Sequence, residues 1–215
     1  MDYNSGNSKV ITKSASSDFE RITEYIKNDI MIADAAFYIF CKLEELTTKD
    51  DVYSAMNNSK CFWQVFLYSS FNTTLLIIAR LFEKGDGFSI RKYLNYIEQH
   101  AEMVDVDNQS KLKTAVANYK KWLEEHKTII DKIYGIRNKS IVHNDKKTIK
   151  QALDLIEQNE LTIGEIKELI EYIKTVLSDI CLLYDGRVIN LEATNRDDYR
   201  GVIMKLVPNH DNNIL

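Results

Sequence analysis

Residues 61–82 read CFWQVFLYSSFNTTLLIIARLF, and this stretch decides the fold because it is apolar almost all the way round a helix. A membrane span usually needs about 20 predominantly apolar residues. Here the apolar run is interrupted by polar residues, namely Gln64, Ser69, Ser70, Asn72, Thr73 and Thr74. A helix buried on all sides of a bundle has the same signature. We therefore interpret residues 61–82 as the central helix of a bundle and expect no membrane partner.

The flanking sequence predicts further helices around this one. One proline and seven glycines in 215 residues favour helices, because both residue types interrupt helical hydrogen bonding. Apolar residues recur at steps of three and four from Ser17, which together with Glu20 resembles a capping box. The expected helices cover about residues 17–46, 61–82, 89–100, a long stretch from 110, and 162–184. We predict an all-α, up-and-down bundle.

The predicted domain organisation is one bundle with an appendage. The bundle takes residues 1–184, with its ordered core starting at about 17, and residues 185–215 form a polar C-terminal appendage with one short helix beginning near 194. The cysteines, Cys41, Cys61 and Cys181, form no CxxC pair and are expected to be buried thiols. Together with a polar N-terminus unlike a signal peptide, they predict a cytoplasmic protein. The four histidines are too far apart in sequence for a metal motif, so we expect neither metal nor cofactor.

The net charge of -4 hides a basic segment. Residues 111–150 contain eleven Lys or Arg against four acids, a local balance of +7, whereas the remainder of the chain balances to -11. A basic stretch within an acidic protein suggests a surface that faces a polyanion. A solvated helix face is the alternative.

Arg137 continues an apolar seam in this segment. The seam steps by four and three through Leu112, Val116, Tyr119, Leu123, His126, Ile130 and Ile133. Because burial without a partner forfeits hydration, Arg137 must meet a carboxylate, reach solvent at the end of the bundle or face a cleft. Arg80, near the end of the central helix, is expected to pair with an acid such as Glu83 or to extend outwards; a second phosphate contact is the alternative.

The stretch GIRNKSIVHND, residues 135–145, combines Arg137 and Asn138 with His143. Six residues at about 100° each place His143 roughly 120° around a straight helix from Arg137. For both to act on one phosphate, the helix must bend or end between them, or a second subunit must supply a complementary face.

An arginine followed by a histidine after four to six residues resembles the motif of HEPN domains. The blocks IARLFEKGDGFSIRKYLNYI and YGIRNKSIVHND, in that order, resemble the HEPN domain of AbiU-type abortive-infection proteins over about residues 20–184. The resemblance implies a bundle that forms a homodimer, with two copies of the motif in one cleft. Many HEPN proteins are metal-independent ribonucleases of toxin–antitoxin and antiphage systems, while others are inactive binding modules.

Carried onto this sequence, the resemblance implies that His143 is the general acid/base and that Arg137 binds the phosphate. Asn138 would orient the histidine or the phosphate. A cognate antitoxin is a further implied partner. Some HEPN toxins carry a tyrosine, modified by a partner nucleotidyltransferase, where this chain has Asp145. That departure puts control by such a modification in doubt. Asp145 could instead orient His143 or cap a helix end.

These residues suit RNA cleavage, because RNA carries its own nucleophile, the 2′-hydroxyl. Imidazole exchanges protons near neutral pH, and a guanidinium stabilises the charge that builds on a phosphate. The first hypothesis is an endoribonuclease acting on RNA, transfer RNA included, with Lys132, Lys139, Lys146 and Lys147 as RNA contacts. The second is a non-catalytic module that binds RNA, a nucleotide or a partner protein. The third is a structural dimer whose arginine and histidine are salt-bridged.

Overall fold

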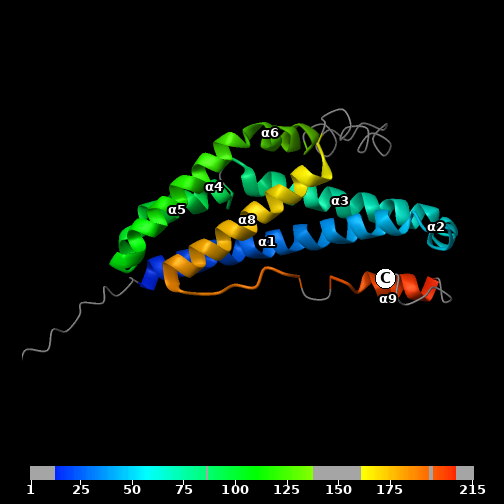
Figure 1. The fold of residues 1–215 in the computed structure, drawn as a ribbon, viewed down its shortest axis with the longest axis horizontal. Coiled ribbons are helices and arrows are strands. Elements are labelled where there is room, and N and C mark those ends of the chain that lie inside the picture. Colours follow the sequence, from blue (N-terminus) through cyan, green and yellow to red (C-terminus); the bar gives the residue numbers. More distant parts are fainter. Residues whose placement is uncertain (1–12, 86, 138–160, 194–195, 207–215) are drawn as a thin grey trace, which may run out of the picture.

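The computed structural model describes residues 13–85, 87–137, 161–193 and 196–206. Within these ranges no strand occurs, which confirms the all-α prediction. The elements in chain order are α1 (Lys13–Leu46), α2 (Asp50–Asn57), α3 (Lys60–Phe82), α4 (Ile90–Gln99), a 3-10 turn η1 (Ala101–Met103), α5 (Val106–Glu125), α6 (Lys127–Ile136), α8 (Ile163–Asp185) and α9 (Tyr199–Leu206). Figure 1 shows α1 and α3 side by side along the length of the bundle.

The pairing of α1 and α3 follows from their apolar faces. On α1 the buried residues recur at helical spacing through Ile26, Ile30, Ala33 and Phe37, as the sequence predicted. On α3 they include Leu75 and Ile78, at 1% and 0% exposure. Among the described helices, α3 is the one long and apolar enough to cross a membrane. Its inner face packs in the common core, as expected of a central helix. The expectation of burial on all sides is wrong, because Phe62 and Val65 are each 57% exposed.

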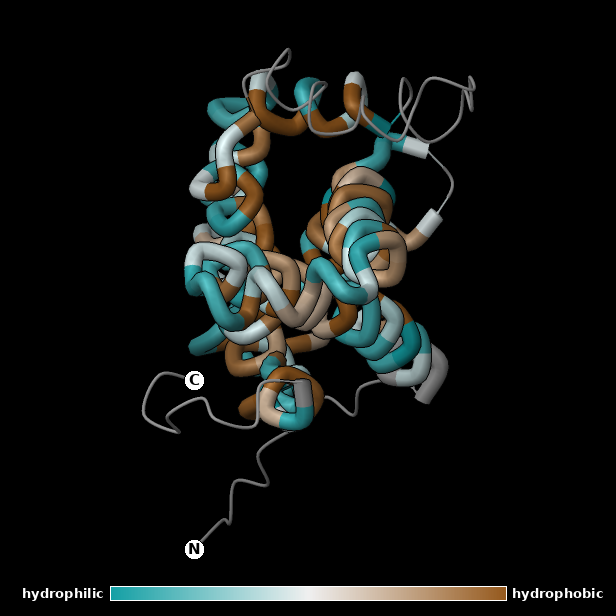
Figure 2. Tube along the Cα trace, turned by 90° about the vertical axis from the view of Figure 1, so that its right-hand side faces the viewer, coloured by the Kyte–Doolittle hydropathy of each residue, from teal (hydrophilic) through white to brown (hydrophobic). Residues whose placement is uncertain are grey.

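Helix α8 packs against α1, α6 against α3 and α4 against both, while α5 packs against α4 and α8. In a view along the bundle, the colour of the helix tubes changes between hydrophobic and hydrophilic within a turn (Figure 2). The seam of the basic segment is buried at Leu112, Val116, Leu123, Ile130 and Ile133. The predicted continuous helix is wrong, however, because the chain breaks between α5 and α6 and α6 turns towards α3 (Figure 1).

His126 lies at this break, with backbone angles of φ -100° and ψ 16°. Its Nδ1 lies 2.9 Å from the Trp122 carbonyl oxygen, and its ring stacks on the indole of Trp122 at 3.7 Å. Its Nε2 lies 3.0 Å from the carboxylate of Glu168 on α8. The backbone hydrogen bonds from His126 N–H to the Trp122 carbonyl (2.9 Å) and from Ile130 N–H to the His126 carbonyl (3.2 Å) are kept across the break.

Two of the predicted helix starts are confirmed. The Ser89 hydroxyl accepts a bond from the Lys92 amide at the start of α4. At α8, Thr162 and Glu165 form a complete capping box, in which each side chain accepts from the other residue's backbone N–H. At α1 the prediction was late, since the helix already begins at Lys13. The sequence also missed α2, a helix of eight residues in a polar segment.

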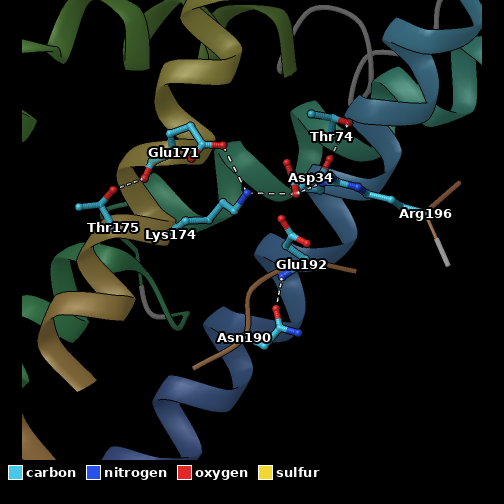
Figure 3. A network of polar contacts seen from close by, with 9 residues as sticks. Asp34, Thr74, Glu171, Lys174, Thr175, Asn190, Glu192 and Arg196 are labelled. Carbon is cyan, nitrogen blue, oxygen red and sulfur yellow. Dashed lines mark hydrogen bonds and ion pairs between the residues drawn. The ribbon is translucent and has the colours of Figure 1, made fainter. Parts of the chain in front are cut away.

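The C-terminal segment returns along α1. Gly186, with φ 76°, ends α8 in the left-handed conformation that glycine adopts without strain. Asp34 of α1 lies 3.2 Å from Lys174 of α8 and 4.0 Å from Arg196 of the returning segment, and Figure 3 shows the three side chains together. The short helix α9, predicted from about residue 194, covers residues 199–206 and buries Ile203 in a second apolar cluster with α1, α2 and α3.

The three cysteines have different environments, and all three are free thiols. Cys181 is buried and Cys41 is half-buried, whereas Cys61 is exposed. The expectation of buried thiols is therefore wrong for Cys61. It lies in the first turn of α3, before the helix enters the core.

Candidate anion-binding pocket at Arg137

Arg137 follows the last residue of α6, at the point where this helix meets α3. Ile133 and Ile136 are each 1% exposed and anchor the end of α6 in the core. The Arg137 backbone is still helical, with φ -52° and ψ -50°. Its side chain therefore continues the seam of Ile130 and Ile133, as the spacing predicted, and 26% of it is exposed.

The Arg137 side chain lines a pocket of about 420 Å³ against the last turns of α3. The other lining residues are Thr73, Leu76, Ile77, Arg80 and Glu83. Arg137 Nη1 lies 3.4 Å from Glu83 Oε1, whereas charge-assisted hydrogen bonds are usually about 2.7–2.9 Å long. Glu83 is 43% exposed, so this is a long ion pair at the edge of solvent. Of the alternatives posed by the sequence, Arg137 thus meets both a carboxylate and a cleft.

Arg80 faces the same pocket but has a different partner from the one expected. Its Nη2 lies 2.6 Å from Oδ2 of Asp29 on α1, and its guanidinium carbon is 5.7 Å from the centre of the Tyr25 ring. The Asp29 side chain is 12% exposed and that of Arg80 is 45% exposed. Burial raises the pKa of Asp29, and the positive charge and hydrogen bond of Arg80 oppose that rise. The expectation that Arg80 pairs with an acid is correct, but the example of Glu83 was wrong.

Tyr134 lies one helical turn before Arg137. Its hydroxyl is buried and has no hydrogen-bond partner among the described residues. Burial and the charge of Glu83 raise the pKa of Tyr134 to about 12, although Arg91 and Arg137 act in the opposite direction. Sequence reasoning missed Tyr134, Asp29 and the pairing of Glu83 with Arg137, because nothing in the spacing links residues 54 positions apart.

A larger pocket of about 610 Å³ adjoins this one at Thr73, between α1 and α3. Its lining carries no charged side chain and consists mainly of small and aliphatic residues, such as Ile32, Ala35 and Ile39. Volume alone would favour this apolar groove. The charged groups needed to bind an anion line the smaller pocket instead.

The basic segment that surrounds Arg137 is partly neutralised. Lys120 pairs with Glu98 at 2.7 Å and Lys121 with Glu125 at 3.5 Å. For these two lysines the structure favours the solvated helix face that the sequence left open.

Lys132, one of the predicted RNA contacts, lies 2.8 Å from the capping-box residue Glu165 and is 25% exposed. The structure thus connects it to the start of α8, and its RNA contact stays a prediction. The other predicted site residues, Asn138, Lys139, His143, Asp145, Lys146 and Lys147, lie outside the described residues. The described residues contain no group of three or more side chains that could hold a metal ion.

Comparison with known protein families gives one match. A family model for the HEPN domain of AbiU2 matches residues 16–202, which include the central helix, the Arg137 pocket and the start of α9. Comparisons with curated proteins and with solved structures gave no match.

Proposed function

The chain belongs to the AbiU2 family of HEPN domains, and from this premise we propose that it is a metal-independent endoribonuclease of an abortive-infection or toxin–antitoxin system. The family itself points to a role in abortive infection. The step from family to enzyme rests on the chemistry of the 135–145 segment and on the pocket at its start.

The observation that carries the proposal is the position of Arg137. Its guanidinium lines an open pocket, with a long ion pair to Glu83 in place of a tight one. A phosphodiester entering this pocket offers two non-bridging oxygens, which match the planar donors of a guanidinium. Arg137 then stabilises the extra negative charge of the pentacovalent transition state.

His143 supplies the proton transfer in this proposal. It accepts the proton of the RNA 2′-hydroxyl, the 2′-oxygen attacks the adjacent phosphorus, and the bond to the 5′-oxygen breaks. The leaving 5′-oxygen takes up a proton from the protonated imidazole, so the products are a 2′,3′-cyclic phosphate and a 5′-hydroxyl. The nucleophile belongs to the substrate, so the reaction has no obligatory metal. Asn138 orients the histidine or the phosphate, and Asp145 either orients the imidazole or caps a helix end.

We further propose that the active form is a cytoplasmic homodimer with a composite site. Arg137 and His143 are about 120° apart on a straight helix, so a second copy of the motif is the simplest source of the missing group. Lys132, Lys139, Lys146 and Lys147 contribute positive charge for the RNA backbone. A cognate antitoxin would bind the same complex.

The test is cleavage of total RNA and transfer RNA in EDTA, followed by analysis of the product ends. The parent should leave 2′,3′-cyclic phosphates, and His143→Ala should leave the RNA intact while keeping the parent's circular dichroism spectrum. Cleavage that stops in EDTA, or that His143→Ala retains, contradicts the proposal. A surface control, Lys121→Ala, should cut as the parent does.

The ion pair between Arg137 and Glu83 favours a second candidate, a non-catalytic module that binds RNA, a nucleotide or a partner protein. In that case Arg137 would serve binding or structure, and no proton transfer would occur. RNA that shifts on a gel equally with the parent and with His143→Ala, and that neither protein cuts, would select this candidate.

A further inference from the structure

Two arginines from different helices line the pocket at Arg137. Arg80 comes from α3 and Arg137 from the end of α6, and both are lining residues together with Thr73. Two guanidiniums and a hydroxyl all donate hydrogen bonds. Such a set of groups is suited to an oxyanion.

The carboxylates beside the two arginines differ in a way that assigns them different roles. Asp29 is 12% exposed and lies 2.6 Å from Arg80, so it holds that guanidinium closely from the α1 side. Glu83 is 43% exposed and lies 3.4 Å from Arg137. Arg80 itself is 45% exposed and Arg137 is 26% exposed, so the two pairs differ in their length and in the burial of the carboxylate. A long pair to an exposed carboxylate costs little to break, whereas a close pair to a buried carboxylate holds its partner in place.

Glu83 follows the last residue of α3, where the regular helix has ended. Its backbone has φ -59° and ψ 145°, outside the helical region, so its position is set by the turn and not by helix packing. The carboxylate can therefore leave the pocket by a side-chain rotation. Its departure would uncover the charge of Arg137, whereas Arg80 would keep its partner Asp29.

We propose that Arg80 is a second anion-binding residue of this pocket and that Glu83 occupies the anion position at Arg137 until a phosphate group of the RNA backbone displaces it. The identity of the anion as an RNA phosphate rests on the proposed function. In this arrangement Asp29 keeps Arg80 oriented, Arg80 and Arg137 share the phosphate, and Glu83 competes with it.

The test measures binding without cleavage. The probe is a fluorescent 2′-O-methyl RNA oligonucleotide, whose 2′-oxygen cannot attack, read by anisotropy with the full-length chain. Arg80→Gln should weaken binding about tenfold, the size expected for one charge-assisted contact. Glu83→Gln, which removes the competitor's charge, should tighten binding several-fold.

Arg200→Gln is the matched control, because Arg200 on α9 is 43% exposed and pairs with Asp197 at 3.6 Å. It should bind as the parent does. Since Arg80→Gln leaves the buried Asp29 unpaired, the double variant Arg80→Gln/Asp29→Asn provides a neutral pair that folds without that penalty. It should show the same loss of binding, and melting curves should establish that each variant is folded.

Parent-like binding by the folded double variant overturns the inference, as does weaker binding by Glu83→Gln. Inorganic phosphate is the second probe. If it raises the melting temperature of the parent but not of the Arg80 variants, and the RNA does not bind, the ligand is free phosphate and the RNA assignment is overturned. A parent that binds neither overturns the inference entirely. If the parent binds RNA through Arg80 but cuts none, the nuclease proposal falls and this inference stands. If the parent cuts RNA and the Arg80 variants cut equally well, the nuclease proposal stands and this inference falls.

Discussion

Replacing Asp34 with asparagine should destabilise the protein and loosen its C-terminal segment. Asp34 is 9% exposed near the middle of α1. Its Oδ2 lies 3.2 Å from Lys174 of α8 and 4.0 Å from Arg196 of the returning chain (Figure 3). Asparagine has nearly the same shape, so the substitution removes the charge with little change in packing.

The size of the effect follows from the exposure of the two cations. Removing one member of a buried ion pair costs about 3–5 kcal/mol, because the other charge is left uncompensated. Lys174 is 17% exposed and keeps Glu171 at 3.3 Å, and Arg196 is 31% exposed. Both residual charges are therefore partly compensated or hydrated, and we expect a loss of about 2 kcal/mol, below that range. For a chain of this size, it lowers the melting temperature by about 4–8 °C.

The assay is urea unfolding of the parent, Asp34→Asn, Lys174→Met and the double variant. We expect a coupling energy of about 1–2 kcal/mol between the two positions, since they touch. The control Asp18→Asn breaks an exposed pair with Arg21 and should cost less than about 0.5 kcal/mol. If Asp34→Asn costs no more than this control, or if the cycle shows no coupling, the network does not stabilise the fold as described.

Three further predictions concern the start of α8, the core and the thiols. Glu165→Ala removes half of the α8 capping box and should cost about 1 kcal/mol at neutral pH. Burial raises the pKa of Glu165, but hydrogen bonds from its neighbours outweigh burial and hold this pKa below the ordinary 4.5. The parent's higher free energy of unfolding relative to Glu165→Ala should therefore be present above about pH 4.5 and vanish as the pH falls through the folded-state pKa. Urea unfolding at several pH values measures this difference. Ile78→Ala, at a fully buried position of α3, should cost about 3 kcal/mol in the same assay, whereas Ile32→Ala, 53% exposed, should cost under about 0.5. A thiol reagent should modify Cys61 in the native protein and reach Cys181 only on unfolding, because burial hides that thiol and raises its pKa to about 11.

Each of these has a result that contradicts it. If the difference in free energy of unfolding between the parent and Glu165→Ala stays the same from pH 7 to pH 3, the stabilisation by the cap does not depend on the carboxylate charge. Equal costs for Ile78→Ala and Ile32→Ala would contradict the inner and outer faces assigned here. Native reactivity of Cys181, measured by mass spectrometry of labelled peptides, would show that the core opens readily.

Much of the fold could be predicted because apolar spacing is a local property. The buried seam from Leu112 to Ile133 follows from steps of three and four, and the capping box at Thr162 from residue types three apart. The break at His126 could not be read in this way. The contact of the His126 imidazole with Glu168, 42 residues later, joins residues that only the packing of α8 brings together.

The candidate site shows the same division. The position of Arg137 on the seam already required a carboxylate, solvent or a cleft. Which carboxylate Arg137 meets was not predictable, since Glu83 is brought to it where the end of α3 meets the end of α6. The pairing of Arg80 with Asp29 is tertiary information of this kind.

The most direct test of the central claim is single-turnover cleavage of transfer RNA in EDTA by the parent and by Arg137→Ala. We expect the parent to cut and Arg137→Ala to be slower by about 10²–10³-fold, the usual effect of removing one donor that stabilises a developing negative charge. Both proteins should unfold cooperatively. Equal rates for the two folded proteins, or no cleavage by the parent in any RNA, would contradict the account.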